Sequence, residues 1–509
     1  MNTGSDYKTN SNDTGGRAFM LFLLFGIGIY LFTSMGLSGL AIAAFVPALI
    51  IITYLTFKYD MFSFWALFAV NYLIMFLDRH SISSSLPVSV TIEFFEIVLL
   101  VAAIIKVKGF EFANCLNIMG FIVSVWIVFG LLQAFNDTMG LGLNWASWFQ
   151  GFNINFINLL FIFLVHSLYI SNPKRVNQYL IIFALFSIFG AFWVWKQKTF
   201  GFTDAERQWL ETRGRSTHIL NAGTLIRYFG TFTDAANMGC NMASAAVMYT
   251  IIAITTKLKR HRIFFAITAL LCIYGMMQSG TRTAMACLIA GLAVYVFLSK
   301  SFKIAIPFSI MFACFLFILA FTNIGNSNQQ IRRMRTTFNQ NDASRSVRDI
   351  NQETMRKYLK DAPWGIGIGD RTEHVPPTHK YKIMTTIPPD SEYVFFWIHT
   401  GQIGLIILII VNITILLGAS WVTMFNINNP RLRGIAAGIT CAFVSLQLGG
   451  YGNQVLFQFP NGIMFYGAIS IVFVLPRMET QFNEWEGKLI AKEEERKRLK
   501  LEKKRASRV

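Results

Sequence analysis

The sequence predicts an all-α fold, a polytopic bundle of about 14 transmembrane helices (12–14), with a large extracytoplasmic loop between two late helices. Of the 509 residues, 54% are hydrophobic and 14% are charged, and apolar stretches of roughly 16 to 23 residues recur from end to end. A bilayer requires every backbone polar group to be bonded internally, so we expect these stretches to be helices. The strict alternation of apolar and polar residues that a β-barrel needs is absent from the sequence.

The expected spans follow one another along the whole chain. They cover residues 18–34, 37–57, 61–77, 89–105, 116–135, 154–171, 177–195, 236–256, 262–278, 283–299, 303–321, 394–416, 434–449 and 460–475. The first 17 residues lack the basic start and the small-residue cleavage site of a signal peptide, so the first span is expected to remain as an anchor.

The formal net charge of +18 follows the expected topology. If the N-terminus is cytoplasmic, the short outer connections carry only Arg79 and Arg282. The short inner connections and their edges carry Lys58, Lys106, Lys108, Lys174, Arg175, Lys257, Lys259, Arg260, Arg262, Lys300, Lys303, Arg431, Arg433 and Arg477. This asymmetry predicts that both termini are cytoplasmic. We therefore expect the basic residues to contact membrane lipids, not nucleic acid.

Two long outer segments interrupt the helices and are expected to be functional, because connections of this length usually are. The expected division is a cytoplasmic N-terminal segment (1–17), N-terminal helices (18–195), a first outer loop (196–235), helices with an SGTRTA turn (236–321), a large outer loop (322–393), C-terminal helices (394–476) and a charged cytoplasmic tail (477–509). The large loop holds seven arginines. A solvated helix over SVRDINQETMRKYLKDA would also explain part of this charge.

Several catalytic motifs are missing from the sequence. It contains no GxxxxGK[ST] loop, no HExxH and no GxSxG, so a nucleotide-driven pump or a zinc hydrolase is unsupported. His374 and His379 could ligate a metal together with Asp370, but loop histidines without cysteine partners are more often solvated. We therefore expect no metal and no cofactor. The six cysteines lie in or at the edges of spans and imply no disulfide framework.

Four segments, in this order and with this topology, resemble the O-antigen ligase and O-antigen polymerase superfamily. They are Arg227-Tyr-Phe-Gly-Thr-Phe-Thr-Asp-Ala-Ala-Asn237, Ser279-Gly-Thr-Arg282-Thr-Ala, the stretch from Arg356 through Pro363 to Gly367, and Asp390-Ser-Glu-Tyr393 followed by Gly401 and Gly404. Members of this superfamily are integral-membrane glycosyltransferases that act on polyprenyl-diphosphate-linked glycans. The resemblance covers roughly residues 220–475.

The resemblance implies an enzyme of the bacterial inner membrane that transfers a glycan from polyprenyl diphosphate to an acceptor glycan or lipid on the outer face. Chain-length and polysaccharide export proteins are the further partners that it implies. Many ligases carry histidine and asparagine where this chain has Asp390 and Ser391, and this departure favours a polymerase of surface-polysaccharide repeats. A ligase to lipid A core or protein remains the alternative within the class.

The resemblance also assigns the candidate site residues. Arg227, Arg282 and Arg356, with Asn237 and Gly367, are expected to bind the diphosphate and the substrate. Arginine suits this role because the departing diphosphate gains negative charge. Asp390, Glu392 and His379 are the candidates for the base that accepts the acceptor's proton. The structural alternatives are arginines that extend to the membrane interface and, for Asp390, a turn after Pro388-Pro389.

Charged residues are rare inside the expected spans, which argues against a third function, lipid transport. Glu93 and Glu96 lie three residues apart on one face of the fourth expected span, where they could pair with Arg79 or another arginine at the rim, or could line a cavity. A flippase for lipid-linked oligosaccharides would be expected to carry charges within the spans of both halves and to lack long outer loops. The concentration of charge outside the spans therefore favours the transferase.

Overall fold

The computed structural model describes residues 50–59, 61–80, 88–220, 225–299, 343–369, 375–387 and 391–506, together with Pro389 and scattered positions between 306 and 335. Over these residues it is a helical bundle with one two-stranded antiparallel sheet, formed by β1 (Ile219–Leu220) and β2 (Leu225–Ile226). The predicted all-α membrane fold is confirmed in this part of the chain.

Within the described residues, eight helices or helix runs are long and apolar enough to cross a membrane. They are α3 (Phe62–Arg79), α5 (Ile118–Leu132) with the turn to Phe135, α6 (Trp145–Phe152) continuing into α7 (Asn158–Tyr169), α8 (Pro173–Phe200), α11 (Ala235–Thr255), α12 (Lys259–Gln278), α18 (Glu392–Trp421) continuing to Asn426, and α19 (Pro430–Gly452). A bent pair, Gly462–Val472 with Leu475–Lys500, makes a ninth if it is one span.

The expected total of about 14 spans is not confirmed, because the described residues account for eight or nine. Two further apolar helices, α4 (Val88–Ile105) and α13 (Arg282–Leu298), coincide with expected spans. The expected spans at 18–34 and 303–321 lie wholly or mostly outside the described residues, and the span at 37–57 is described only from Ile50.

Short polar residues set where several helices begin. The side chains of Asn117, Asn172, Asp234, Ser391 and Asn429 each accept backbone N–H groups from the first turn of α5, α8, α11, α18 and α19, respectively. Proline follows the cap of α8 and of α19, where its missing N–H costs nothing. These local signals fix the ends of the spans near the positions expected from the apolar stretches.

The centre of the bundle is α11, most of whose residues are buried. It packs against α12, α13 and α19. Small residues allow this close approach, as they do in other membrane bundles. At Gly239, for example, an added Cβ would lie 2.3 Å from Ser279 Oγ, so the α12–α13 turn can lie against α11 only because this position is glycine.

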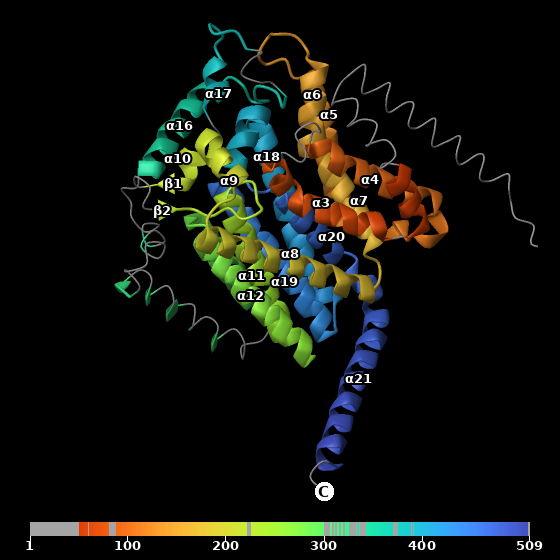
Figure 1. The fold of residues 1–509 in the computed structure, drawn as a ribbon. Coiled ribbons are helices and arrows are strands. Elements are labelled where there is room, and N and C mark those ends of the chain that lie inside the picture. The colour runs from red at the N-terminus through yellow and green to blue at the C-terminus, as the bar shows by residue number, and fades with distance from the viewer. Residues whose placement is uncertain are drawn as a thin grey trace, which may run out of the picture.

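The two ends of the bundle differ (Figure 1). One end, here called the large-loop end, carries α16 (Ala343–Leu359), α17 (Lys382–Thr386) and the β1–β2 sheet. The other, the tail end, is where α21 (Glu479–Ala506) extends away with the C-terminus. The alternative of a helix over SVRDINQETMRKYLKDA is observed as α16, but the helix is not solvated on all sides: its Met355 and Leu359 belong to a small apolar core with Val394 and Ile398 of α18.

Candidate functional site

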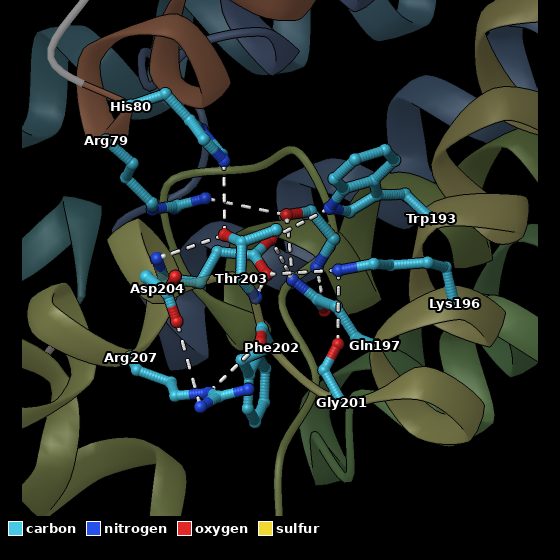
Figure 2. A network of polar contacts seen from close by, with 12 residues as sticks. Arg79, His80, Trp193, Lys196, Gln197, Gly201, Phe202, Thr203, Asp204 and Arg207 are labelled. Carbon is cyan, nitrogen blue, oxygen red and sulfur yellow. Dashed lines mark hydrogen bonds and ion pairs between the residues drawn. The ribbon is translucent and has the colours of Figure 1, made fainter.

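A network of polar contacts holds the loop between α8 and α11 against the large-loop end (Figure 2). Thr203 Oγ1 lies 3.1 Å from His80 Nε2 and accepts the backbone N–H of Glu206 in α9 (Asp204–Trp209). The Glu206 carboxylate is buried and accepts hydrogen bonds from Trp193 Nε1 and Gln197 Nε2, both at 2.8 Å. The loop is thereby tied to the ends of α3 and α8.

Arg79, the last residue of α3, supports the chain segment that follows β2. Its buried guanidinium donates to the backbone carbonyl of Phe232 and, at 2.6 Å, to that of Thr233. The guanidinium carbon also lies 4.7 Å from the ring centre of Trp209 and 4.5 Å from that of Phe229. Arg79 therefore stabilises the loop through carbonyls and aromatic rings.

Unlike Arg79, Glu96 on α4 makes no side-chain hydrogen bond to the described residues. Its side chain is fully buried, and neither carboxylate oxygen has a hydrogen-bond partner among the described residues. Arg79, one of the cations with which Glu96 could have paired, bonds backbone carbonyls instead. Glu96 thus lies within the bundle, separate from the contacts that organise the large-loop end.

Arg227 joins two of the four motif segments, which are far apart in the sequence. From its position directly after β2, it donates from Nε to Ser279 O at 3.2 Å and from Nη2 to Thr281 Oγ1 at 2.8 Å. Its Nη1 donates to Thr217 O at 2.9 Å. The Thr281 hydroxyl in turn donates to the carbonyl of Ala235, at the start of α11, at 3.0 Å. Arg227 thereby fixes the SGTRTA turn beside the N-terminus of α11.

Arg282, the first residue of α13, is half-buried at this turn. Burial lowers the pKa of the nearby Arg227 guanidinium; Asp234 opposes this shift, and the like charge of Arg282 adds to it. Both arginines thus bring positive charge to the same turn. The N-terminus of α13 adds the partial positive charge of the helix dipole. Two arginines and a helix N-terminus together favour a bound anion.

His218 caps α11 from the other side of the same loop. Its Nε2 accepts the backbone N–H of Ala235 at 3.1 Å, and its Nδ1 lies 3.0 Å from Gly214 O. Burial lowers the pKa of His218 from 6.5 to about 4; the hydrogen bond to Gly214 and Asp234 oppose the shift, whereas Arg227 and Arg79 add to it. The imidazole is therefore neutral at neutral pH, as its acceptor role requires.

We expect this cap to make the first outer loop sensitive to acid. Because the folded pKa of His218 is about 4 and its ordinary value is 6.5, the unfolded chain binds more protons between these values. The stabilisation is complete above pH 6.5 and is lost as the pH falls toward 4, by roughly 3 kcal/mol at most. Amide hydrogen exchange of residues 201–220 at pH 7 and pH 4.5, corrected for the intrinsic rate, measures this loss.

The matched control is His261→Gln, which removes a histidine of α12 at the tail end of the bundle, away from the first outer loop. His218→Gln keeps a hydrogen-bond acceptor that does not titrate, so the excess opening of residues 201–220 at pH 4.5 should disappear in it. An acid response that persists in His218→Gln would assign the sensitivity to another group.

The segment 453–461, between α19 and the helical turn Gly462–Tyr466, brings the motif segments together, and the sequence analysis missed it. Asn237 Nδ2 donates to Gln458 Oε1 at 2.9 Å, and Asn241 Nδ2 donates to Asn461 Oδ1 at 2.7 Å. Both acceptors follow an apolar span. The signal in the sequence was a cluster of amide side chains between two spans: Asn453, Gln454, Gln458 and Asn461.

Glu392, the first residue of α18, binds the same segment. Its side chain is 5% exposed, and its Oε2 accepts the backbone N–H of Leu456 at 3.0 Å. The neighbouring Tyr393 donates its hydroxyl to Gln447 Oε1 on α19 at 3.0 Å. In this structure Glu392 therefore positions the segment 453–461 relative to α18.

The third and fourth motif segments pack directly on each other. Gly365 and Gly367 have φ values of +75° and +100°, and the N–H of Gly367 donates to His399 O at 3.0 Å. Opposite them, α18 is kinked at Gly401, where φ is +67° and an added Cβ would lie 2.1 Å from Pro363 O. The glycines are required for this backbone contact, so Gly367 contributes through its main chain.

Of the remaining base candidates, His379 is described and Asp390 lies outside the described residues. Both ring nitrogens of His379 have backbone partners: Nε2 lies 2.8 Å from Met139 O, and Nδ1 accepts the N–H of Tyr381 at 3.2 Å. His379 thereby connects the large loop to the loop before α6. Among the described residues, no group of three or more His, Cys, Asp or Glu side chains is placed to hold a metal ion.

Two arginines of α16 differ in their surroundings. Arg356, the expected substrate ligand, is exposed. Arg348, which the sequence analysis did not single out, donates from Nη2 to Gly452 O at 3.0 Å. An added Cβ at Gly452 would lie 2.6 Å from Thr283 Oγ1, and Thr283 directly follows Arg282. Arg348 therefore reaches the end of α19 beside the SGTRTA turn.

The sequence also matches a known protein family. The family model described as O-antigen ligase matches residues 267–409, which include three of the four motif segments and leave Arg227 to Asn237 outside. No curated protein matches the chain. The family match confirms the resemblance that the motif segments predicted, to the O-antigen ligase and polymerase superfamily, in the part of the chain that contains the SGTRTA turn, the large loop and the start of α18.

Proposed function

We propose that this chain transfers a glycan from polyprenyl diphosphate to a sugar acceptor on the outer face of the bacterial inner membrane, and that it polymerises surface-polysaccharide repeats. The large-loop end would face outward, and α21 would lie in the cytoplasm. The sorting of basic residues among the short connections supports this orientation. The family match at residues 267–409 supports the class of chemistry.

The observation that carries the proposal is the arginine arrangement at the SGTRTA turn. Arg227 holds the turn through Ser279 O and Thr281 Oγ1, and Arg282 begins α13 from the same turn. Arg348 reaches the neighbouring end of α19. These cations come from three separate parts of the chain and lie at the large-loop end of the bundle, where we propose that the lipid-linked diphosphate binds.

In the proposed reaction, the acceptor hydroxyl attacks the anomeric carbon of the donor glycan, and the bond between that carbon and the diphosphate oxygen breaks. The electron pair of that bond leaves with the polyprenyl diphosphate. Fixed guanidinium groups stabilise the charge that develops on the leaving group, and they need no reorganisation during the reaction. The arginines would therefore take the role that metal ions and Lys/Arg clamps have in other phosphate chemistry.

The acceptor's proton passes to a base. Of the three candidates we favour Asp390, because His379 has backbone partners at both ring nitrogens and Glu392 binds the backbone of Leu456. The departure from the histidine of many ligases supports a polymerase.

A strain that lacks this protein tests the proposed function. We expect single repeat units to remain on the lipid carrier or on their acceptor, facing outward, and the ladder of longer chains to disappear, because polymerisation follows translocation. Carrier-linked glycans would be extracted and sized by gel electrophoresis, and their sidedness would be probed with an impermeant glycosidase. Re-expression of the parent protein is the control.

The other functions give different results in the same strain. A ligase would leave long chains on the carrier and an empty acceptor, which would contradict the polymerase. A flippase would leave single units facing the cytoplasm, protected from the glycosidase, and would contradict the transferase itself. An unchanged ladder would contradict all three functions for this chain.

A further inference from the structure

A lipid-sized groove lies at the tail end of the bundle, opposite the proposed glycosyltransferase site. It is formed where the start of α5, the end of α18 and the chain before α21 converge, and its volume is about 470 Å³. Ligand pockets in proteins commonly enclose roughly 300–1,000 Å³. Most of its surface is apolar and is contributed by residues such as Ile118, Trp421 and Phe473.

The groove depends on a glycine. Gly418 lies in α18, one helical turn before its end at Trp421, and an added Cβ there would lie 2.8 Å from Ile118 Cγ2 and 3.1 Å from Phe473 Cε1. A larger side chain would therefore enter the space between the three elements. Ile118 and Trp421 are 44% and 61% exposed, respectively, so the groove opens on a surface that would face lipid tails.

The end of the groove nearest α21 is polar and positively charged. Arg477 lines it and is exposed, with Nη1 donating to Asn114 Oδ1 at 3.3 Å. A guanidinium has five N–H donors in a planar fork, a geometry that suits a phosphate oxygen pair. Asn426 also lines the groove. An apolar groove with a cation at its headgroup end is complementary to an anionic lipid.

We propose that this groove binds an anionic glycerophospholipid of the leaflet at the tail end, with one acyl chain along Gly418 and the phosphate on Arg477. Basic pockets between transmembrane helices at the cytoplasmic side are a recurring way of binding anionic headgroups. The bound lipid would fill the contact between α5 and α18. Because both helices continue to the large-loop end, it would stabilise the bundle that carries the motif segments.

Native mass spectrometry of the full-length protein tests the proposal, with dioleoyl phosphatidylglycerol and dioleoyl phosphatidylcholine offered at equal concentration. We expect the parent to retain phosphatidylglycerol about fivefold in preference, which is the factor from about 1 kcal/mol per basic residue. Arg477→Gln should lose the preference, and Gly418→Leu should bind less of both lipids. Arg433→Gln, which removes a charge at the same end outside the groove, is the matched control.

Each outcome decides the proposal. Equal retention of both lipids by the parent, an unchanged preference in Arg477→Gln, or a preference lost equally in Arg433→Gln would overturn it. Because Gly418→Leu could also disturb folding, each variant is first compared with the parent by size-exclusion chromatography and thermal melting. Displacement of phosphatidylglycerol by an equal amount of polyprenyl phosphate would assign the groove to the carrier lipid and would also overturn the proposal.

Discussion

Replacement of Arg282 by lysine is expected to lower the rate of glycan transfer about 10²-fold, the low end of the loss on removing one transition-state donor. Lysine keeps the positive charge, but its ammonium cannot reproduce the paired donors of a guanidinium on a diphosphate. Because Arg282 begins α13 at a turn held by Arg227, the substitution should leave the turn in place. The measurement is glycan output at equal protein level, followed by transfer from a lipid-linked donor by the purified protein.

The matched control for this substitution is Arg207→Lys. Arg207 belongs to the loop at the same end of the bundle, has an exposed side chain and donates from Nε to Phe202 O (Figure 2). We expect Arg207→Lys to transfer glycan at the parent rate. If Arg282→Lys does so as well, Arg282 has only a structural role at the membrane interface, and the diphosphate must be bound elsewhere.

The spans were the easiest part of the fold to predict. Apolar length marks a helix in lipid whatever its neighbours are, and short polar caps such as Asn117, Asp234 and Ser391 mark where the helices begin. The bend of α18 at Gly401 was not predicted. It depends on the contact with Pro363 across the large loop, which lies close only after folding.

The candidate site was predicted in part, for a similar reason. The four motif segments identified Arg227 and Arg282, which the structure brings to one turn. The segment 453–461 was missed because its amide side chains carry no charge and match no motif. Their role becomes visible only when Asn237 and Gln458, which are 2.9 Å apart, are seen together.

Arg348 was missed because it lies outside the motif segment that begins at Arg356. Substitution of Arg348 by glutamine is expected to lower glycan transfer about 10- to 100-fold, from the roughly 1.5–3 kcal/mol of a hydrogen bond to a charged group. The reason is its position: its guanidinium reaches Gly452 O, next to Thr283 and the SGTRTA turn. The measurement is transfer by the purified protein as a function of donor concentration, and the loss should appear mainly as a higher KM for the lipid-linked donor.

Arg356→Gln is the matched control, because it makes the same change two helical turns further along α16 at an exposed position. If the large loop contributes its cation through Arg348, Arg356→Gln should change the KM for the donor by less than about twofold, within the usual effect of a surface substitution. Arg348→Lys should restore part of the affinity, because a point charge still attracts the diphosphate, whereas a purely structural bond to Gly452 would change thermal stability and leave the KM unaltered. A large rise in KM for Arg356→Gln together with a parental KM for Arg348→Gln would reverse the assignment, and would mean that α16 contacts the substrate near its C-terminal end.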